Sequence, residues 1–422
     1  MKAITFLGAG KAFETAYVFE DGQEYTAPYF GVALSQHYPD LEMRVLVTPE
    51  AKEKHWQRFQ EMVGDAAELE AIDIQGGHTE EELWDIFETV IEVVEKGEQV
   101  IFDITHGFRS LPFLSFLAAA YLRVVEEIEL VAVLYGNFEA RDQSVTPNRA
   151  PVIDLTPFVG LLDWMVAADR FVRFGDAHDL AERLRASKPD YRQQQHDPGQ
   201  RRIAKTLSDT AKALDSVSSA LRLIRPNDAI IASDKLQTDL TDATQGIQSF
   251  ARPFQPLSRR VISEYAPLAA NQEIYSSDLT VALDRERRLV YWYLDRRQYV
   301  QAMAVAREWI VTWALAHLGY SDQFDKEARG QIERAMGAQI QKRSGKAGYD
   351  SRPDPTIKVD LTDVPQLKTA IDLYSALGNT RNDLLHAGKR RAPQPANRME
   401  KQIIKLCNRL DELPLLGDLG NK

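Results

Sequence analysis

Short apolar runs alternate with longer amphipathic segments along the first 155 residues. The runs predict buried strands, because continuous aliphatic residues over this length are typical of strands covered on both faces. These runs are KAITFLG, EMRVLVT, LEAIDIQ, QVIFDIT and IELVAVLYGNF, and APVIDLTPF closes the segment. The segments between them have helical periodicity: GVALSQHY, AKEKHWQRFQEMV, TEEELWDIFETVIEVVEKG and SLPFLSFLAAAYLRVVEE. This alternation predicts βαβ units, a parallel sheet and a Rossmann-like α/β domain over residues 1–156.

From about residue 157 the strand signal almost disappears and helical periodicity takes over. The clearest helical segments are FVGLLDWMVAADRFVRFG, RIAKTLSDTAKALDSVSSALRLI, ATQGIQSFARPFQPLSRRVISEYAPL, YVQAMAVAREWIVTWALAHLG and VPQLKTAIDLYSALGNTRNDLLHAG. Polar breaks separate them at 187–200, at IRPNDA and at 342–356. Residues 157–422 are therefore predicted to form an all-α region.

Composition and charge agree with two domains. The 422 residues are 44% hydrophobic and 27% charged, which is ordinary for a soluble globular protein. Residues 1–156 hold 11 Lys and Arg against 28 Asp and Glu, whereas the remainder holds 40 against 34. The acidic charge of the first part either keeps that domain soluble or separates two domains with different partners, and the basic second part could meet a polyanion.

The same counts narrow the class of protein. No apolar run approaches the roughly 20 residues needed to span a bilayer, and the N-terminus lacks the apolar region of a signal peptide. The single cysteine, Cys407, excludes a disulfide framework and a cysteine-based zinc site. We therefore expect a cytoplasmic protein without a membrane partner.

Two strand-ending loops carry the candidate chemistry. In open parallel sheets, ligands bind beyond the carboxyl ends of the strands. We predict that both loops start helices and bind an anion, usually phosphate, with Lys11 and Arg109 offsetting its charge. The candidate ligand residues are Gly8, Gly10, Lys11 and Thr15 in GAGKAFET, and Thr105, His106, Gly107, Phe108, Arg109 and Ser110 in DITHGFRSLPF, with Ser110 as an N-cap.

Rival interpretations remain for these loops. GAGKAFET resembles a dinucleotide fingerprint, but Phe13 stands where the third glycine or alanine belongs, and the Walker A spacing is absent. His106 is either a ligand-binding group or a structural histidine at the strand edge. Phe108 either stacks on a base or fills the sheet edge.

DITHGFRSLP resembles the signature of the CRISPR-associated DxTHG family, in which Asp103, Thr105, His106 and Gly107 match the four named positions. The run LLDWMVAADRFVRFGDA (161–177) is also similar to that family. The resemblance covers the first ~180 residues well and the rest loosely. It implies an N-terminal CARF sensor domain and a C-terminal helical HEPN ribonuclease domain, acting as an accessory effector of type III CRISPR systems. It further implies a CARF dimer that binds a cyclic oligoadenylate, with the tetra-adenylate first and the hexa-adenylate second, and a HEPN dimer that degrades RNA. Asn137 in YGNFEA would read a base edge or a ribose.

A HEPN ribonuclease has an arginine, often a following polar residue, and a histidine a few positions later. TRNDLLHAG supplies Arg381, Asn382 and His386 near a predicted helix end and before a basic stretch. Arg173 and His178 share the spacing, but they lack the asparagine, and Gly175 predicts a helix end between them. Arg381–His386 is therefore the preferred catalytic pair.

The chemistry suits these residue types. RNA supplies its own nucleophile, the 2′-hydroxyl. His386 would transfer a proton near neutral pH, and Arg381 would stabilise the charged transition state. This reaction needs no metal and would give 2′,3′-cyclic phosphate and 5′-hydroxyl ends. Residues five apart on a helix are about 140° apart around its axis, so a complete site is easier to build from two copies. We therefore expect single-stranded RNA as the substrate and a homodimer or higher homo-oligomer.

Three alternatives stay open. The chain could be a ligand-sensing regulator that binds nucleic acid without cutting it, a nicotinamide-dependent oxidoreductase, or a sensor that also cleaves its own cyclic ligand. The pair Arg307–Glu308 and the aromatic residues Trp309 and Trp313 are expected to be structural.

Overall fold

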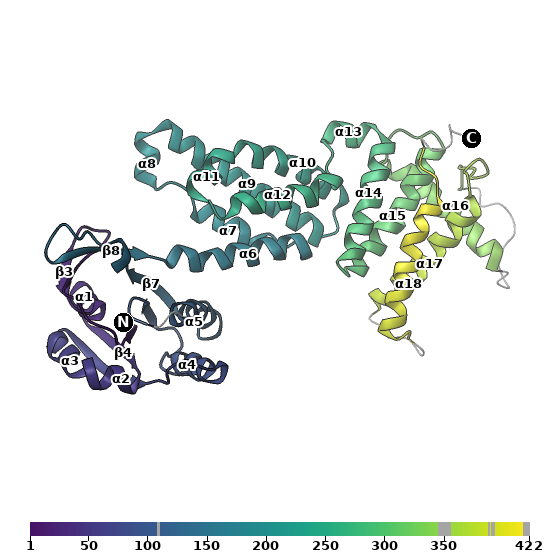
Figure 1. Cartoon of the computed structure of the whole chain (residues 1–422). Helices are drawn as coiled ribbons and strands as arrows, with labels where there is room; N and C mark the ends of the chain where they lie inside the picture. The colour runs from purple at the N-terminus through teal and green to yellow at the C-terminus, as the bar shows by residue number, and fades with distance from the viewer. Residues whose placement is uncertain (108–109, 345–355, 387–388, 390–392, 417–422) are drawn as a thin grey trace. The chain divides into compact units, whose positions relative to one another are not determined.

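The computed structural model describes residues 1–107, 110–344, 356–386, 389 and 393–416. The chain divides into two compact units, Met1–Asp163 and Trp164–Lys422. The division falls within a single helix, α6 (Thr156–Phe174) (Figure 1). The first unit carries the described strands and the second is largely helical, so the predicted fold class is confirmed.

Eight strands of the first unit form one sheet in the order β3-β2-β8-β7-β6-β1-β4-β5. Their bounds are β1 Lys2–Leu7, β2 Thr15–Val18, β3 Glu24–Ala27, β4 Leu41–Val47, β5 Ala67–Asp73, β6 Gln99–Asp103, β7 Glu129–Gly136 and β8 Asn148–Asp154. The five strands β5-β4-β1-β6-β7 are parallel, whereas β8 is antiparallel to β7 and β3 to β2. The sheet is therefore mixed, and its parallel part, which extends from β7 to the edge strand β5, is the one that the apolar runs predicted.

Helices cover both faces of this sheet. Their bounds are α1 Phe30–His37, α2 Pro49–Ala51, α3 Gln57–Val63, α4 Glu80–Glu92 and α5 Leu111–Val125, with a π-helical segment, η1, over Lys52–Trp56 between α2 and α3. Alternate residues of β1 enter different cores: Leu7 packs with α1 and α3, and Phe6 packs with α4 and α5. The period-two alternation of a strand buried on both faces accounts for this division.

The prediction that GAGKAFET starts a helix was wrong. The loop leads into β2, and β2 and β3 form a hairpin whose turn contains Asp21 and Gly22. Gly22 has a φ of 85°, a backbone conformation that glycine adopts without strain, and its N–H donates to the Phe19 carbonyl at 3.0 Å. Asp-Gly between alternating residues is a known hairpin signal, so this element was present in the sequence.

The second unit is built from helices that share one large core. After α6 these are α7 His178–Ala186, α8 Tyr191–His196, α9 Pro198–Arg222, α10 Pro226–Asp242, α11 Thr244–Phe250, α12 Phe254–Tyr265, α13 Gln272–Ser277, α14 Leu279–Asp295, α15 Tyr299–His317, α16 Lys326–Ser344, α17 Leu367–Leu385 and α18 Ala396–Asn408. The segment 243–268, predicted as one helix, is interrupted around Pro253. The polar stretch 187–200, predicted as a break, contains α8, which a capping box at Asp190 starts.

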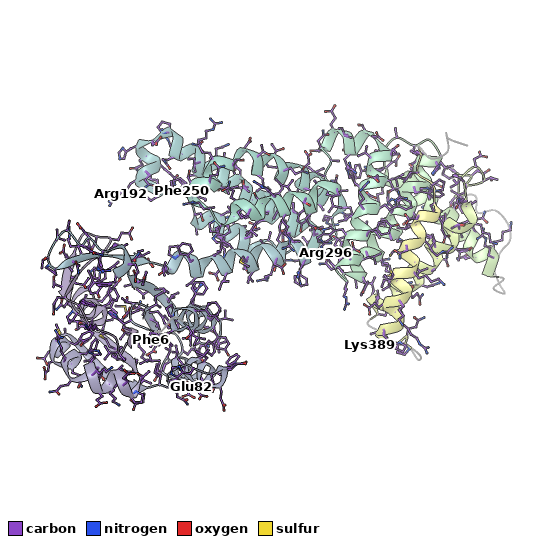
Figure 2. The ribbon with its side chains drawn as sticks, viewed as in Figure 1. Phe6, Glu82, Arg192, Phe250, Arg296 and Lys389 are labelled. Carbon is purple, nitrogen blue, oxygen red and sulfur yellow. The ribbon has the colours of Figure 1, made fainter. Side chains whose placement is uncertain are left out.

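Buried aromatic and ionic contacts hold this unit together. Trp309 and Trp313 are fully buried on α15, and their indole N–H groups donate to the carbonyls of Leu283 (2.8 Å) and Pro414 (2.7 Å). Arg296, labelled in Figure 2, donates to the Val172 carbonyl at 3.0 Å and pairs with Glu264. The aromatics that were expected to be structural are therefore core residues.

Within the described ranges, no helix is both long enough and apolar enough to cross a membrane.

Candidate functional site

A pocket of about 670 Å³ lies at the carboxyl ends of β1, β4, β5 and β6. Within the sheet, β4 and β5 lie on one side of strand β1, and β6 and β7 lie on the other side of it. The order therefore reverses between β1 and β6, which is the topological switch point where doubly wound sheets bind ligands.

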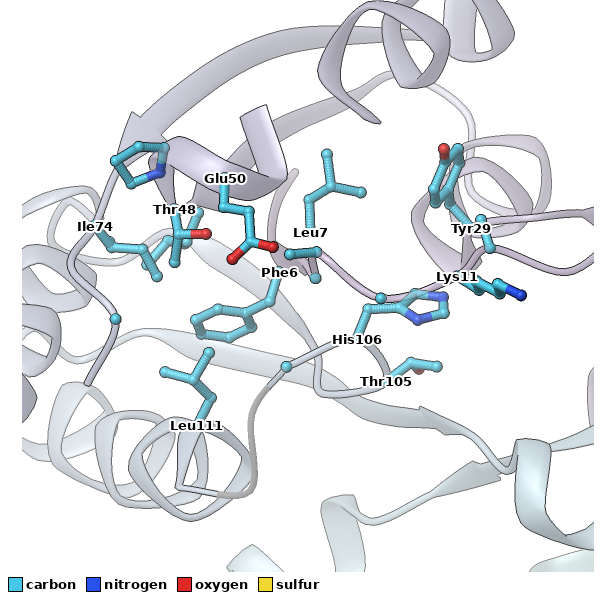
Figure 3. A pocket seen from close by; sticks show the side chains of 18 of the residues that line it. Phe6, Leu7, Lys11, Tyr29, Thr48, Glu50, Ile74, Thr105, His106 and Leu111 are labelled. Atoms are coloured by element: carbon cyan, nitrogen blue, oxygen red, sulfur yellow. The ribbon is translucent and has the colours of Figure 1, made fainter. Parts of the chain in front are cut away.

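Six of the predicted ligand residues meet in this pocket (Figure 3). They come from two loops that follow adjacent strands, and they are Gly8, Gly10, Lys11, Thr105, His106 and Gly107. The Lys11 side chain is exposed and forms no ion pair with any described residue. Its ammonium group is therefore available to an anion.

The motif residue Asp103 links neighbouring strands behind the pocket through hydrogen bonds. Its buried carboxylate accepts hydrogen bonds from the Thr5 hydroxyl of β1 (2.5 Å) and the Thr105 backbone N–H (2.8 Å). The Thr105 hydroxyl in turn accepts the N–H of Gly136 in β7 at 2.8 Å. Burial raises the pKa of Asp103 to about 6, although the bonds from Thr5 and Thr105 oppose that rise. Asp103 and Thr105 thus join three neighbouring strands beneath the pocket floor.

His106 connects the same loop to helix α1. Its Nε2 accepts the backbone N–H of Phe30 at 3.0 Å, and the Tyr17 hydroxyl lies 3.5 Å from that nitrogen. Phe30 is the first residue of α1, where N–H groups have no partner inside the helix. Because Nε2 accepts a bond, the neutral ring carries its proton on Nδ1. Burial, and then the nearby His55, lower the pKa of His106 to about 4. His106 is therefore a structural acceptor whose ring also lines the pocket.

The other predicted ligand residues are placed differently. Thr15 is buried in β2, and its hydroxyl donates to the Phe13 carbonyl at 2.9 Å. Ser110 occupies the N-cap position of α5 without a side-chain capping bond to a described residue, and the Asn137 side chain accepts the Ala140 N–H at 3.1 Å. None of these three is among the described residues that line the pocket. Phe108 and Arg109 lie outside the described residues.

Sequence reasoning missed the half of the pocket contributed by β4 and β5. Thr48, Pro49 and Glu50 follow β4, and Gly76 and His78 follow β5. The available signal was the rule that all parallel strands of a sheet end at the same edge. Among these residues, Glu50 stands out because its carboxylate points into the pocket (Figure 3).

The second candidate site lies at the end of α17. Arg381, Asn382 and His386 are exposed, whereas Thr380 and Asp383 are buried. The His386 N–H donates to the Asn382 carbonyl at 3.1 Å, so one helical turn joins these two residues. A hollow of about 560 Å³ adjoins this helix end and is lined by Leu384, Tyr299 and Glu400 among others. Gly388, the predicted stop of the helix, lies outside the described residues.

The competing pair of equal spacing does not form one site. Arg173 lies in the last turn of α6 and pairs with Asp169 at 2.9 Å, whereas His178 begins α7. Gly175 lies between them with a φ of 73°. The predicted helix end between the two residues is confirmed.

Among the described residues, no group of three or more His, Cys, Asp and Glu side chains has an arrangement that could hold a metal ion.

Two comparisons find similarity to a CRISPR-associated protein. Residues 160–268 match the family described as CRISPR-associated protein MJ1674, second domain. A stretch of 114 residues is 27% identical to the CRISPR-associated protein MJ1674 of Methanocaldococcus jannaschii, and covers 26% of this chain and 18% of that protein. The matched family segment includes neither the pocket residues nor Arg381–His386. Over residues 160–268, the chain is thus similar to the second domain of a CRISPR-associated protein.

Proposed function

We propose that this chain is a CRISPR-associated sensor and effector, in which a cyclic oligoadenylate activates a metal-independent endoribonuclease. The first unit would act as the CARF sensor and the end of the second as the HEPN ribonuclease. The observation that carries this proposal is the pocket at the β1–β6 switch point, where the Gly8–Lys11 loop meets Thr105–Gly107. The similarity to MJ1674 supports the CRISPR context.

The pocket favours a phosphate-bearing ligand. Glycines at positions 8 and 10 leave backbone amides accessible, and a Cβ at Gly10 would have no neighbour within 4 Å. Lys11 adds a cation in a unit that is otherwise strongly acidic. A cyclic tetra-adenylate is our first choice and the hexa-adenylate our second, because the resemblance to the DxTHG family favours the smaller ring.

A nicotinamide dinucleotide is disfavoured by the fold. Dinucleotide-binding loops of the Gly-x-Gly type open a helix, whose N-terminus holds the pyrophosphate. Here the loop opens strand β2 instead. Cleavage of the ligand by His106 is disfavoured as well, because its Nε2 already accepts the Phe30 N–H.

For RNA cleavage, Arg381 and His386 are our catalytic candidates and Asn382 their neighbour. Their exposure on α17 leaves them accessible to a substrate strand and to a second copy of the chain. His386 would transfer the proton between the 2′-hydroxyl and the leaving oxygen, and Arg381 would hold the phosphate.

The deciding experiment measures cleavage of single-stranded RNA with and without each cyclic oligoadenylate. We expect cleavage only with the correct ring, and a loss of at least about 100-fold for Arg381→Ala and for His386→Ala. Arg173→Ala and His178→Ala form the matched control, because that pair shares the spacing without sharing a helix. Unchanged cleavage in His386→Ala would contradict the catalytic assignment. Binding of RNA without cleavage under any cyclic oligoadenylate would instead favour a regulator that binds RNA without cutting it.

A further inference from the structure

The pocket has two chemically different ends (Figure 3). At one end, Lys11 lies beside His106 and the glycine loop. At the other end, Phe6, Ile74 and Leu111 form an apolar wall. A ligand that fits both ends carries an anion on one side and an apolar, planar group on the other, as a nucleotide does.

The Glu50 carboxylate lies between these ends. It extends from α2 into the pocket, toward Phe6 (Figure 3). The hydrogen bond and charge of Lys54, whose Nζ is 2.5 Å from Glu50 Oε1, lower the pKa of Glu50, so the group is ionised at neutral pH. A carboxylate accepts about four hydrogen bonds, so the bond to Lys54 leaves acceptor capacity on the pocket side.

A negative charge in a phosphate pocket needs a chemical reason. Glu50 repels the phosphates of a ligand, and Lys54 offsets that repulsion in part. A ligand that donates a hydrogen bond to the carboxylate offsets it further. A nucleotide has two kinds of donor that can reach it: a ribose hydroxyl and an amino group of the base.

The position of Glu50 in the fold favours the ribose. Glu50 follows β4, the strand beside β1 on the side away from β6. In dinucleotide-binding doubly wound folds, a carboxylate at the carboxyl edge of the sheet accepts the ribose 2′-hydroxyl. Glu50 lies at that edge, although the loop after β1 leads into a strand rather than a helix. The apolar wall formed by Phe6, Ile74 and Leu111 then suits the base rather than the sugar.

We propose that Glu50 accepts the 2′-hydroxyl of a ribose bound in this pocket, and thereby selects ribonucleotide over deoxyribonucleotide ligands. The inference rests on the proposed function, since it takes the ligand to be a nucleotide. In a 3′,5′-linked ring each 3′-oxygen is esterified, so the 2′-hydroxyl is the sugar donor that remains.

A double-mutant cycle tests this assignment. Binding of cyclic tetra-adenylate and of its all-2′-deoxy counterpart is measured by calorimetry on the full chain and on Glu50→Ala. We expect the full chain to bind the ribose ring at least about tenfold more tightly, and Glu50→Ala to reduce that ratio to about twofold or less. Comparing the two ratios cancels the repulsion between Glu50 and the phosphates, because Glu50→Ala removes it for both rings. It also cancels any difference in conformation between ribose and deoxyribose, because that difference is the same for both proteins.

Glu53→Ala is the matched control. Glu53 is exposed in the next segment, carries the same charge and does not line the pocket, so its loss should leave the ratio unchanged. A cyclic tetra-inosinate, which lacks the adenine amino group, tests the base. If Glu50→Ala removed discrimination against inosinate and kept discrimination against deoxyribose, Glu50 would read the base, and the proposal would be wrong.

The same measurements distinguish a failure of the proposed function from a failure of the role assigned to Glu50. If the full chain binds no cyclic adenylate of either sugar, the proposed function fails, and this inference fails with it. If it binds both sugars equally well, the nucleotide ligand stands and the role of Glu50 is overturned.

Discussion

At the residue scale, the signature Asp-x-Thr-His-Gly is mainly a frame for the pocket. Asp103 and Thr105 connect β1, β6 and β7, and His106 holds the start of α1. Of the motif residues, Thr105, His106 and Gly107 were predicted to touch the ligand, and all three line the pocket. The hydrogen bonds of Thr105 and His106, however, are made to other groups of the protein, so the effect of these residues on a ligand is largely one of positioning.

His106→Ala should loosen the start of α1. The Phe30 N–H would lose its acceptor in a partly buried place, which costs about 1–3 kcal/mol. Hydrogen exchange at the first turn of α1 should become faster, while peptides of the helical unit keep their rates. His196→Ala, at an exposed position of α8, is the control. Unchanged exchange at Phe30 would show that the bond contributes nothing.

Asp103 should make stability depend on pH. Its pKa of about 6 in the folded state exceeds the ordinary value near 4, so the folded protein holds this proton more tightly than the unfolded chain. The contribution of Asp103 to the free energy of unfolding is therefore fully present below about pH 4 and is lost as the pH rises through 6. Relative to the native chain, Asp103→Asn should gain roughly 2–3 kcal/mol in free energy of unfolding between pH 4 and pH 7.

Urea denaturation at both pH values measures this difference. Comparing the two proteins cancels the opposite contribution of His106, whose lowered pKa removes stability as the pH falls from about 6.5 toward 4. A difference that stays constant from pH 4 to pH 7 would mean that Asp103 is ionised throughout.

At the scale of elements, the close approach of α1 and α3 explains a glycine inside a helix. A Cβ on Gly31 would lie 2.9 Å from a ring carbon of Phe59, which is itself buried. Gly337 in α16 differs, because a Cβ there would meet nothing within 4 Å. The same substitution should therefore have opposite effects in the two helices.

Gly31→Ala should destabilise the sheet-bearing unit by about 1–3 kcal/mol, because the extra methyl group overpacks the α1–α3 contact. Gly337→Ala should stabilise the helical unit by about 0.5–1 kcal/mol, because alanine has the higher helix propensity. Hydrogen-exchange mass spectrometry of the full chain reads the two units separately. Stabilisation by both substitutions would mean that Phe59 moves aside without cost.

At the scale of the whole molecule, the proposed ribonuclease should work as a dimer. Arg381 lies near the end of α17 and His386, five residues later, is its C-cap, and residues at this spacing do not share a helix face. Analytical ultracentrifugation should show a species of twice the 47.8 kDa chain, and cleavage per chain should fall when the protein is diluted below its dimerisation constant. A fully active monomer would remove the requirement for a second copy.

The sequence by itself determined the local features of this protein. Apolar runs placed the five parallel strands, helical periodicity placed most helices, and Gly175 marked the end of α6. The sequence also located both loops of the switch point and the end of α17 that carries Arg381 and His386. These features follow from residues close together in the chain, where periodicity and turn chemistry act directly.

Only the tertiary structure decided which distant residues share a site. It brought Glu50 and His78 to the edge where Gly8 and His106 lie, and it gave the His106 ring to the Phe30 N–H, 76 positions away. It also showed that β2, rather than a helix, follows the first loop. Strand order and the partners of buried polar groups depend on how separate segments pack, and no local pattern of residues encodes that packing.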